Sequence, residues 1–339
     1  TAGTPLLHIT GQIETPYLDQ EFAYIHEARD QLTMLKAVSK AAFRVRSVET
    51  AISTLKLAVQ TALTAPTGPV SVEIPIDIQS TFIPMPTDLS PLPIPVAVPA
   101  PEALDLVAER LASATRPLLW LGGGARHAGP QVKRLLDMGV GVITSTQGRG
   151  VVNEDDERCL GAFSQNKLVE QFLQSCDALL IAGSRLRSNE TFKYALKLPR
   201  NTLRIDANPA IEGRSYNSEL FICGDAALAL EGLADRLEGR LQIDPTFLAE
   251  LKAVREKSRT QLIADLGPYS AMVEQLQALT GRNFSWVRDV TLSNSIWGNR
   301  LLTLYHPRSG VHALGGGIGQ GLSMGIGAAV AAAETAPER

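Results

Sequence analysis

The hydrophobic positions in the middle of the chain form short continuous runs, separated by amphipathic helical patterns. The apolar runs are Pro117–Leu121, Val140–Thr144, Ala178–Ala182, Thr202–Ile205 and Leu220–Cys223. The helical patterns among them include Glu102–Ala112, Gln131–Met138 and Lys167–Gln174. Short apolar strands that alternate with helices are typical of a parallel sheet covered on both faces. The chain is therefore predicted to have an α/β fold.

The N-terminal region shows a different pattern, with fewer and more widely spaced elements. A strand is predicted at Leu6–Thr10, followed by a polar loop. Apolar residues at helical spacing predict an amphipathic helix near Ser47–Leu63. Alternating apolar positions over residues 70–74 predict a second strand. We expect Pro75 to end that strand, because proline cannot donate to a strand ladder.

Changes in composition predict four segments. Residues 84–101 contain seven prolines and are expected to form a stiff, extended linker after the first region, residues 1–83. Residues 102–236 should form a Rossmann-like central domain. In the last segment, 237–339, a charged helix and a second helix lead to a strand at Ser285–Val290 and then to a glycine-rich block.

Composition and charge limit the classes of function. The 339 residues carry a net charge of −3, without a cluster of basic residues, which argues against nucleic-acid binding. The three cysteines have no metal-ligand spacing and favour a reducing, cytoplasmic compartment. Because no segment resembles a signal peptide or a membrane span, we expect no membrane association. The chain opens on a strand and closes on a helix, so we expect it to be cut at both ends.

The glycine-rich block Gly315–Ala328 is the segment most suggestive of ligand binding. Glycines at this density allow positive φ angles and a close approach of backbone to a ligand. A helical run follows from Met324 to Ala333. We expect the first N–H groups of that helix to point toward whatever occupies the turn.

Several short motifs occur in an order that resembles a known family. They are Thr10-Gly-Gln12, Gly68-Pro-Val70, Ile74-Pro-Ile-Asp77, Leu121-Gly-Gly-Gly124, Gly148-Arg-Gly150, Ile205-Asp206 and the glycine block. The set resembles thiamine-diphosphate-dependent enzymes, and most closely the acetolactate synthase-like group. The resemblance implies that residues 1–83 are the C-terminal part of a pyrimidine-binding domain. It also implies that residues 237–339 are a linker and the N-terminal part of a diphosphate-binding domain.

The resemblance implies roles for residues of the glycine block and the loop before it. Ile318 falls on the position of the apolar wedge that bends thiamine diphosphate into its reactive shape. The backbone carbonyl of Gly316 would accept a hydrogen bond from the aminopyrimidine. Ser293 and Asn294 would contact the diphosphate, although a polar turn without a ligand explains them equally well.

Two residues of the first region match positions near the reacting centre. Gln12 matches a glutamine that reaches the centre from the partner subunit, and His26 lies in a loop that lines the substrate pocket. A surface-loop histidine is an equally good interpretation of His26. The glutamate that activates the aminopyrimidine would precede Thr1, and the Mg²⁺ ligands would follow Arg339. We therefore predict no metal ligands in these 339 residues, and no activity from them alone.

A second ligand is predicted at the carboxyl edge of the central sheet. Gly123, Gly183 and Asp206 follow three different strands, and such an edge is where open α/β sheets bind ligands. By resemblance the ligand could be FAD or ADP, or the site could be empty. An alternative from another class is a nucleotide-binding module that binds no thiamine. A strict Gly-x-Gly-x-x-Gly motif is missing, which argues against a dinucleotide dehydrogenase.

The resemblance implies a thiamine-diphosphate- and Mg²⁺-dependent transferase or lyase that acts on 2-oxo acids or related carbonyl compounds. Acetolactate synthase-like carboligation is the first expectation. Decarboxylation of a 2-oxo acid and C–C bond hydrolysis are the alternatives within the family. A homodimer or homotetramer is also implied, since the family builds each thiamine site from two subunits.

Overall fold

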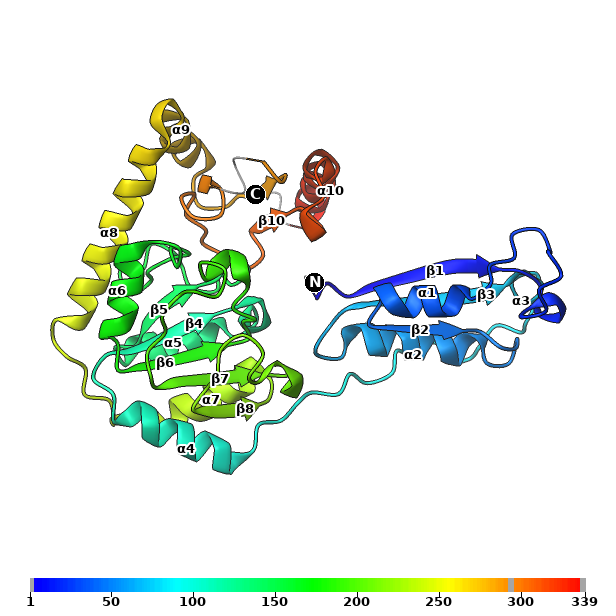
Figure 1. Cartoon of the computed structure of the whole chain (residues 1–339), viewed down its shortest axis with the longest axis horizontal. Helices are drawn as coiled ribbons and strands as arrows, with labels where there is room; N and C mark the ends of the chain where they lie inside the picture. The colour runs from blue at the N-terminus through cyan, green and yellow to red at the C-terminus, as the bar shows by residue number, and fades with distance from the viewer. Residues whose placement is uncertain (1–2, 292–295, 336–339) are drawn as a thin grey trace. The chain divides into compact units, whose positions relative to one another are not determined.

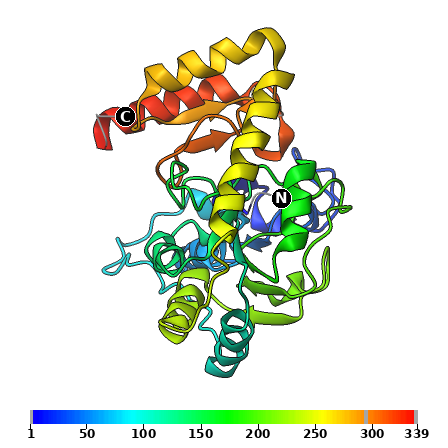
Figure 2. The ribbon, with the colours of Figure 1, turned by 90° about the vertical axis from the view of Figure 1, so that its left-hand side faces the viewer.

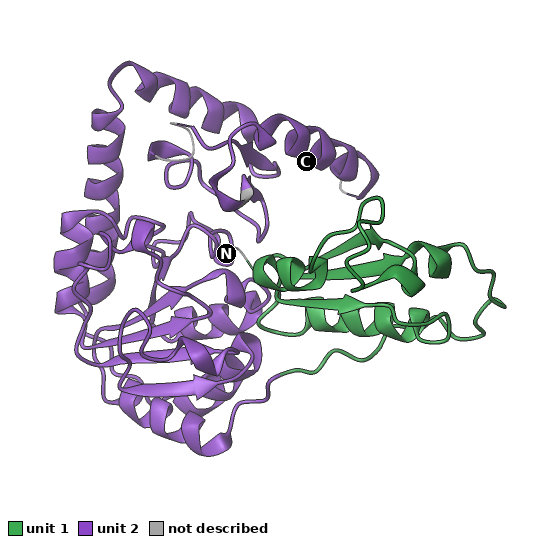
Figure 3. Cartoon of the chain, turned by 45° about the vertical axis from the view of Figure 1, so that its right-hand side comes forward, with its two compact units in different colours: residues 1–96 green, residues 97–339 purple. Residues whose placement is uncertain are grey.

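The structure, a computed structural model, describes residues 3–291 and 296–335. The chain divides into two compact units, Thr1–Val96 and Ala97–Arg339, which are coloured separately in Figure 3. The boundary falls inside the predicted proline-rich linker. The predicted central domain and the residues that follow it, 102–236 and 237–339, lie in the second unit.

The first unit is a small parallel sheet with helices. Its strands are β1 (Leu6–Gln12), β2 (Ala41–Arg44) and β3 (Pro69–Pro75), in the order β1-β3-β2. Its helices are α1 (Gln31–Val38), α2 (Ala51–Leu63) and α3 (Ile76–Gln79). Val70 and Val72 of β3 pack against Ala58 and Ala62 of α2 and form a compact apolar core. The predicted strand does end at Pro75.

The expectation of a polar loop after the first strand is wrong over residues 31–44, which form α1 and β2. Asp30 begins α1, because its carboxylate accepts the backbone N–H of Thr33 at 3.0 Å. The four residues of β2 pair in parallel with β3, Ala41 opposite Val70. Both elements are short, and most of their stabilisation comes from contacts with distant segments rather than from a local pattern.

The second unit contains the predicted α/β layer and confirms the fold class. Its five strands are β4 (Pro117–Leu121), β5 (Gly141–Thr144), β6 (Ala178–Ala182), β7 (Thr202–Asp206) and β8 (Leu220–Cys223). They pair in parallel in the order β5-β4-β6-β7-β8, a doubly wound arrangement. The helices are α4 (Pro101–Ala112), α5 (Gly129–Asp137), α6 (Lys167–Ser175), α7 (Ala226–Leu237), α8 (Phe247–Asp265) and α9 (Ser270–Thr280).

Each face of this sheet has its own apolar core, because successive side chains of a strand point to opposite faces. Leu119 and Leu180 pack with α4, α5 and α7 on one face. Leu118 and Trp120 pack with α6 and α8 on the other face. Figure 1 shows these two helices beside the sheet. All residues of β4, β5 and β6 are buried, which explains their continuous apolar runs.

The glycine-rich loops after β4 and β6 are in contact at the point where the strand order reverses. Gly124 donates its N–H to the carbonyl of Gly183 at 3.0 Å, so the loops after the two strands touch backbone to backbone. A Cβ atom on Gly122 would lie 2.1 Å from that carbonyl oxygen. These glycines are therefore required by packing between the two loops, whether or not a ligand binds there.

The end of the described chain forms a smaller layer. Strands β9 (Trp286–Arg288) and β10 (Gly310–His312) pair in parallel, and α10 (Gln320–Thr335) lies beside them (Figure 2). The helix begins four residues before the predicted Met324. Among the described residues, no helix is both long enough and apolar enough to cross a membrane.

The contact between the two glycine loops predicts that a methyl group added at Gly122 lowers stability far more than one added at Gly327. We expect Gly122→Ala to lower the free energy of unfolding by about 3 kcal/mol, since its Cβ would overlap backbone. Gly327→Ala is the control, because no atom lies within 4 Å of its Cβ position and alanine favours the helix. Chemical denaturation of both variants checks this. Equal stability of the two variants would contradict the packing explanation.

Candidate functional site

The predicted site residues lie in both units, so each group is described separately. Gln12 and His26 belong to the first unit, and the glycine block and the edge of the central sheet belong to the second. Ser293 and Asn294 fall outside the described residues.

Gln12 is the last residue of β1 and is buried. Its side-chain Oε1 accepts the backbone N–H of Ile13 at 2.8 Å. Its Nε2 lies 3.5 Å from Oε2 of Glu73, a carboxylate that is fully buried in the middle strand β3. Sequence reasoning named Gln12 but gave Glu73 no role in the site.

Arg44 balances the charge of Glu73. Its Nε donates to Glu73, and its Nη1 donates to Asp19 at 3.1 Å. Burial alone would lower the pKa of Arg44, but the hydrogen bond and charge of Glu73 more than offset it and raise the pKa. The carboxyl ends of β1, β2 and β3 thus hold a paired, charged network around Gln12.

His26 lies in the loop before α1, and its side chain is exposed. Its backbone has a φ of 66°, in the left-handed region. The neighbouring Glu27 carboxylate accepts the backbone N–H of Tyr24 at 2.9 Å. The structure therefore places His26 on a surface loop and does not bring it into the network around Gln12.

The glycine block forms an open turn before α10. Gly315 and Gly316 have φ angles of 64° and 76°, which favour glycine, and nothing lies within 4 Å of either Cβ position. Ile318 is 79% exposed. The turn thus leaves both the branched side chain of Ile318 and the neighbouring backbone accessible.

A carboxylate lies at the start of α10, where the first N–H groups of the helix are expected to face the occupant of the turn. Asp289, directly after β9, accepts the N–H of Gly319 at 2.8 Å and of Gly321 at 3.1 Å. Hydrogen bonds from the N–H groups of Gly321 and Val290 lower the pKa of Asp289, so the cap is a carboxylate. A bound anion would have to displace this charge.

Asp289 falls inside the strand predicted at Ser285–Val290, whereas the observed strand β9 ends at Arg288, so the strand pattern did not indicate this cap. Among the residues with described positions, no group of three or more His, Cys, Asp and Glu side chains could hold a metal ion.

The three predicted nucleotide residues lie at the same edge of the central sheet. Gly123 and Gly183 follow β4 and β6, and Asp206 is the last residue of β7. Burial raises the pKa of Asp206, and its Oδ1 accepts the N–H of Asn208 at 2.9 Å. Arg126 crosses this edge and donates from Nε to the carbonyl of Gln147 at 2.8 Å.

A buried ion pair links the central sheet to the segment that follows β9. Arg149 and Glu154 are 4% and 6% exposed and form two parallel hydrogen bonds, at 2.8 and 2.7 Å. Arg149 also donates to the carbonyls of Gly298 and Leu302. Glu154 accepts the N–H of Leu304 at 2.8 Å.

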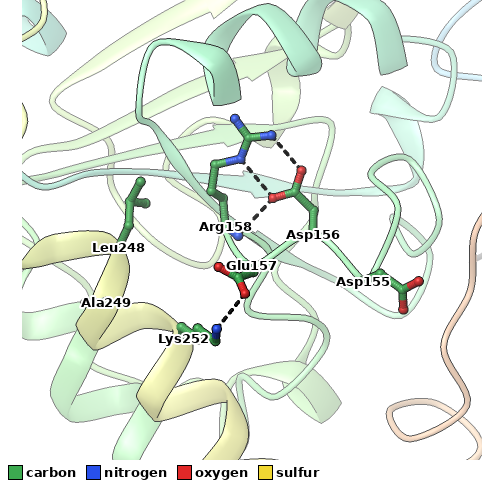
Figure 4. A pocket seen from close by; sticks show the side chains of 7 residues that line it. All are labelled: Asp155, Asp156, Glu157, Arg158, Leu248, Ala249 and Lys252. Atoms are coloured by element: carbon green, nitrogen blue, oxygen red, sulfur yellow. Dashed lines mark hydrogen bonds and ion pairs between the residues drawn. The ribbon is translucent and has the colours of Figure 1, made fainter.

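A pocket elsewhere in the second unit is lined by acidic residues but has its charges paired (Figure 4). Asp156 binds the guanidinium of Arg158 at 2.7 Å. Glu157 binds Lys252 at 2.5 Å. These charged side chains are explained by the ion pairs that they form with one another, without a ligand.

Comparison with known proteins agrees with the order of the motifs. Residues 104–233 match the family described as "Thiamine pyrophosphate enzyme, central domain". A protein named probable 2-ketoarginine decarboxylase, from Pseudomonas aeruginosa, is 26% identical over 92% of this chain and 56% of its own length. Chloroplastic acetolactate synthase 1 of Zea mays is 27% identical over 69% of this chain and 38% of its own.

A third relative is the probable acetolactate synthase large subunit of Methanocaldococcus jannaschii, 26% identical over 68% of this chain and 40% of its own length. The chain thus spans about half the length of these curated relatives, or less. The matches confirm the resemblance seen in the sequence motifs.

The buried ion pair predicts a large cost for removing one charge. We expect Glu154→Gln to lower the free energy of unfolding by about 3–5 kcal/mol, because Arg149 would keep its charge without a buried partner. Glu157→Gln is the matched control: its pair with Lys252 is exposed, and we expect a loss of at most about 1 kcal/mol. Denaturant titration compares them, and a similar loss in both variants would refute the assigned importance of the pair.

His312 predicts a loss of stability in mild acid. Burial lowers the pKa of His312 to about 4, with the positive charges of Arg288, Arg187 and Arg126 acting in the same direction. As the pH falls from about 6.5 toward 4, the unfolded chain binds a proton that the folded chain does not, so stability decreases.

Between pH 7 and pH 4.5, we expect the free energy of unfolding to fall by about 2 kcal/mol less in His312→Asn than in the wild type. The control is His26→Asn, since His26 is exposed and asparagine tolerates its backbone angle. Thermal unfolding at the two pH values measures the difference. An unchanged pH dependence in His312→Asn would show that this histidine is not the cause.

Proposed function

We propose that this chain, which belongs to the thiamine-diphosphate-dependent enzymes of the acetolactate synthase-like family, is part of an enzyme that joins two 2-oxo acids by carboligation. The observation that carries the proposal is the open turn at Gly315–Gly319 with its exposed Ile318, in a chain whose relatives include acetolactate synthases. Thiamine diphosphate, when bound, supplies a nucleophilic carbon and an electron sink for the resulting carbanion.

The residues of this chain would bind and orient the cofactor and the substrate. Ile318 would support the bent cofactor, and the carbonyl of Gly316 would accept a hydrogen bond from its aminopyrimidine. Gln12 would donate a hydrogen bond near the reacting carbon, and His26 would contact the substrate. Ser293 and Asn294 remain proposed contacts of the diphosphate.

Simple decarboxylation is the second candidate, and the relative named as a 2-ketoarginine decarboxylase favours it, because it aligns with 92% of the chain. The two reactions share the loss of CO₂ from a 2-oxo acid. They differ in their products: decarboxylation would release an aldehyde, and carboligation would join the remaining acyl unit to a second 2-oxo acid. C–C bond hydrolysis stays a further prediction from the resemblance.

Several finer features belong to the same proposal. They are Mg²⁺ as the partner of the diphosphate, a homodimer or homotetramer, and a cytoplasmic location without nucleic-acid or membrane partners. FAD or ADP at Gly123, Gly183 and Asp206 remains a prediction, and the direct contact between the two glycine loops argues against it. A nucleotide-binding module without thiamine chemistry also remains a prediction, and the same loop contact argues against it.

Product analysis separates the two reactions. The enzyme in its natural form would be incubated with ¹³C-labelled pyruvate, thiamine diphosphate and Mg²⁺, and separately with 2-ketoarginine, and the products followed by NMR. We expect a branched 2-hydroxy-3-oxo acid from two molecules of pyruvate. An aldehyde as the only product would favour the decarboxylase instead. In a parallel assay, the 339 residues alone are predicted to form no product, and turnover by them would contradict that prediction.

The role of the open turn predicts a specific binding defect. We expect Ile318→Ala to weaken the affinity for thiamine diphosphate about tenfold, because the apolar support of the ring is lost. Leu322→Ala is the control: Leu322 is 78% exposed and lies in the first turn of α10, four residues after Ile318. Isothermal titration calorimetry compares the variants. Equal affinities in the two variants would remove Ile318 from the site.

A further inference from the structure

We propose that Glu73 is a positioning residue that fixes the orientation of the Gln12 carboxamide. This inference rests on the proposed function, because the role of Gln12 near the reacting carbon belongs to that proposal. Neither the sequence motifs nor the relatives assign a role to Glu73. Glu73 is distinguished by its place in the sheet and by the donors that surround it.

Glu73 lies in β3, the middle strand of the first unit, and has a paired residue on each side. In the parallel register, Glu73 pairs with Thr10 on β1 and with Arg44 on β2. Its neighbours Val72 and Ile74 point to the opposite face, into the apolar core beneath α2. Glu73 therefore lies on the polar face of the sheet, with no accessible surface.

The carboxylate of Glu73 accepts hydrogen bonds from three separate elements. Its Oε1 accepts from Nε of Arg44, at the end of β2. Its Oε2 accepts from Nε2 of Gln31, the first residue of α1, at 3.0 Å, and from Nε2 of Gln12 at 3.5 Å. Gln31 also donates to the carbonyl of Gly11 at 2.9 Å, beside Gln12. The three donors hold the carboxylate at one position.

This arrangement allows only one orientation of the Gln12 carboxamide. Its oxygen faces the backbone N–H of Ile13, and its nitrogen faces the carboxylate of Glu73. A flipped amide would place oxygen against carboxylate and nitrogen against an N–H donor, losing both hydrogen bonds. One amide hydrogen of Gln12 is left over, with a direction fixed by the other contacts. A fixed donor near a reacting carbon costs no reorganisation during the reaction.

The fold itself does not explain a charge at this position. A buried carboxylate is costly unless it is paired, and an apolar residue of similar volume is often as stable. The opposite face of the same strand is filled by valines. The retained ion pair with Arg44 is explained if the carboxylate serves Gln12, which needs an acceptor that an apolar side chain cannot supply.

The test measures the side chain of Gln12 directly. In the chain labelled with ¹⁵N-glutamine, the Gln12 resonance is assigned by its loss in Gln12→Met, and its hydrogen exchange is compared with that of the exposed Gln242. We expect the Gln12 amide hydrogens to exchange at least about tenfold more slowly than those of Gln242. Equal rates in the wild-type protein would overturn the proposal without any Glu73 variant.

Two substitutions at Glu73 and one control complete the experiment. We expect Glu73→Met to speed exchange at Gln12 about tenfold, because the acceptor is removed. Glu73→Gln should give an intermediate rate, since an amide oxygen still accepts. Glu49→Met, at an exposed glutamate of the same unit, should leave the rate unchanged. If Glu73→Met does not fold, the wild-type and Glu73→Gln rates decide.

Thiamine diphosphate binding separates this inference from the proposed function. We expect Glu73→Gln to bind the cofactor within about twofold of the wild type, because Glu73 acts through Gln12 rather than on the cofactor. If Gln12 exchanges slowly but the enzyme in its natural form does not bind thiamine diphosphate, the proposed function fails and the positioning stands. An unchanged exchange rate in both Glu73 variants would reject the positioning alone.

Discussion

The ion pair between Arg149 and Glu154 is the constraint on which the second unit depends. Two opposite charges are removed from water, and neither can leave the other without a large desolvation cost. Their remaining hydrogen-bonding capacity is used by backbone groups of residues 298–304. The loop after β5 is thereby joined to the segment between β9 and β10. This link joins residues 298–304, which precede the glycine block, to the central sheet.

The central sheet could be predicted because its strands are buried on both faces. Runs such as Ala178–Ala182 must then be apolar at every position, and helices must lie between them. The same reasoning failed for residues 31–44. There, α1 begins at the carboxylate of Asp30, and β2 gains its hydrogen bonds from β3, some thirty residues away. Neither contact leaves a periodic pattern in the sequence.

In the candidate site, glycine runs likewise show that the sequence pattern alone does not reveal what a segment contacts. Gly122–Gly124 and Gly315–Gly317 look alike as sequence, but the first run packs on the loop of Gly183 and the second meets nothing within 4 Å at Gly315 and Gly316. Only the second leaves backbone exposed for a ligand. The side chains that define the surroundings, Asp289 and Glu73, act through contacts with residues 30 or more positions away. Motif order identified the family, whereas the partners of each site residue required the fold.

The central claim is that thiamine diphosphate binds at the open turn before α10 and not in the crevice of the central sheet. Hydrogen–deuterium exchange of the protein, with and without thiamine diphosphate and Mg²⁺, tests this most directly. We predict slower exchange in the peptide that contains Gly315–Gly319, with no change in the peptides that contain Gly122–Gly124 and Gly183. Protection of the two central loops, with no change at the open turn, would contradict the account.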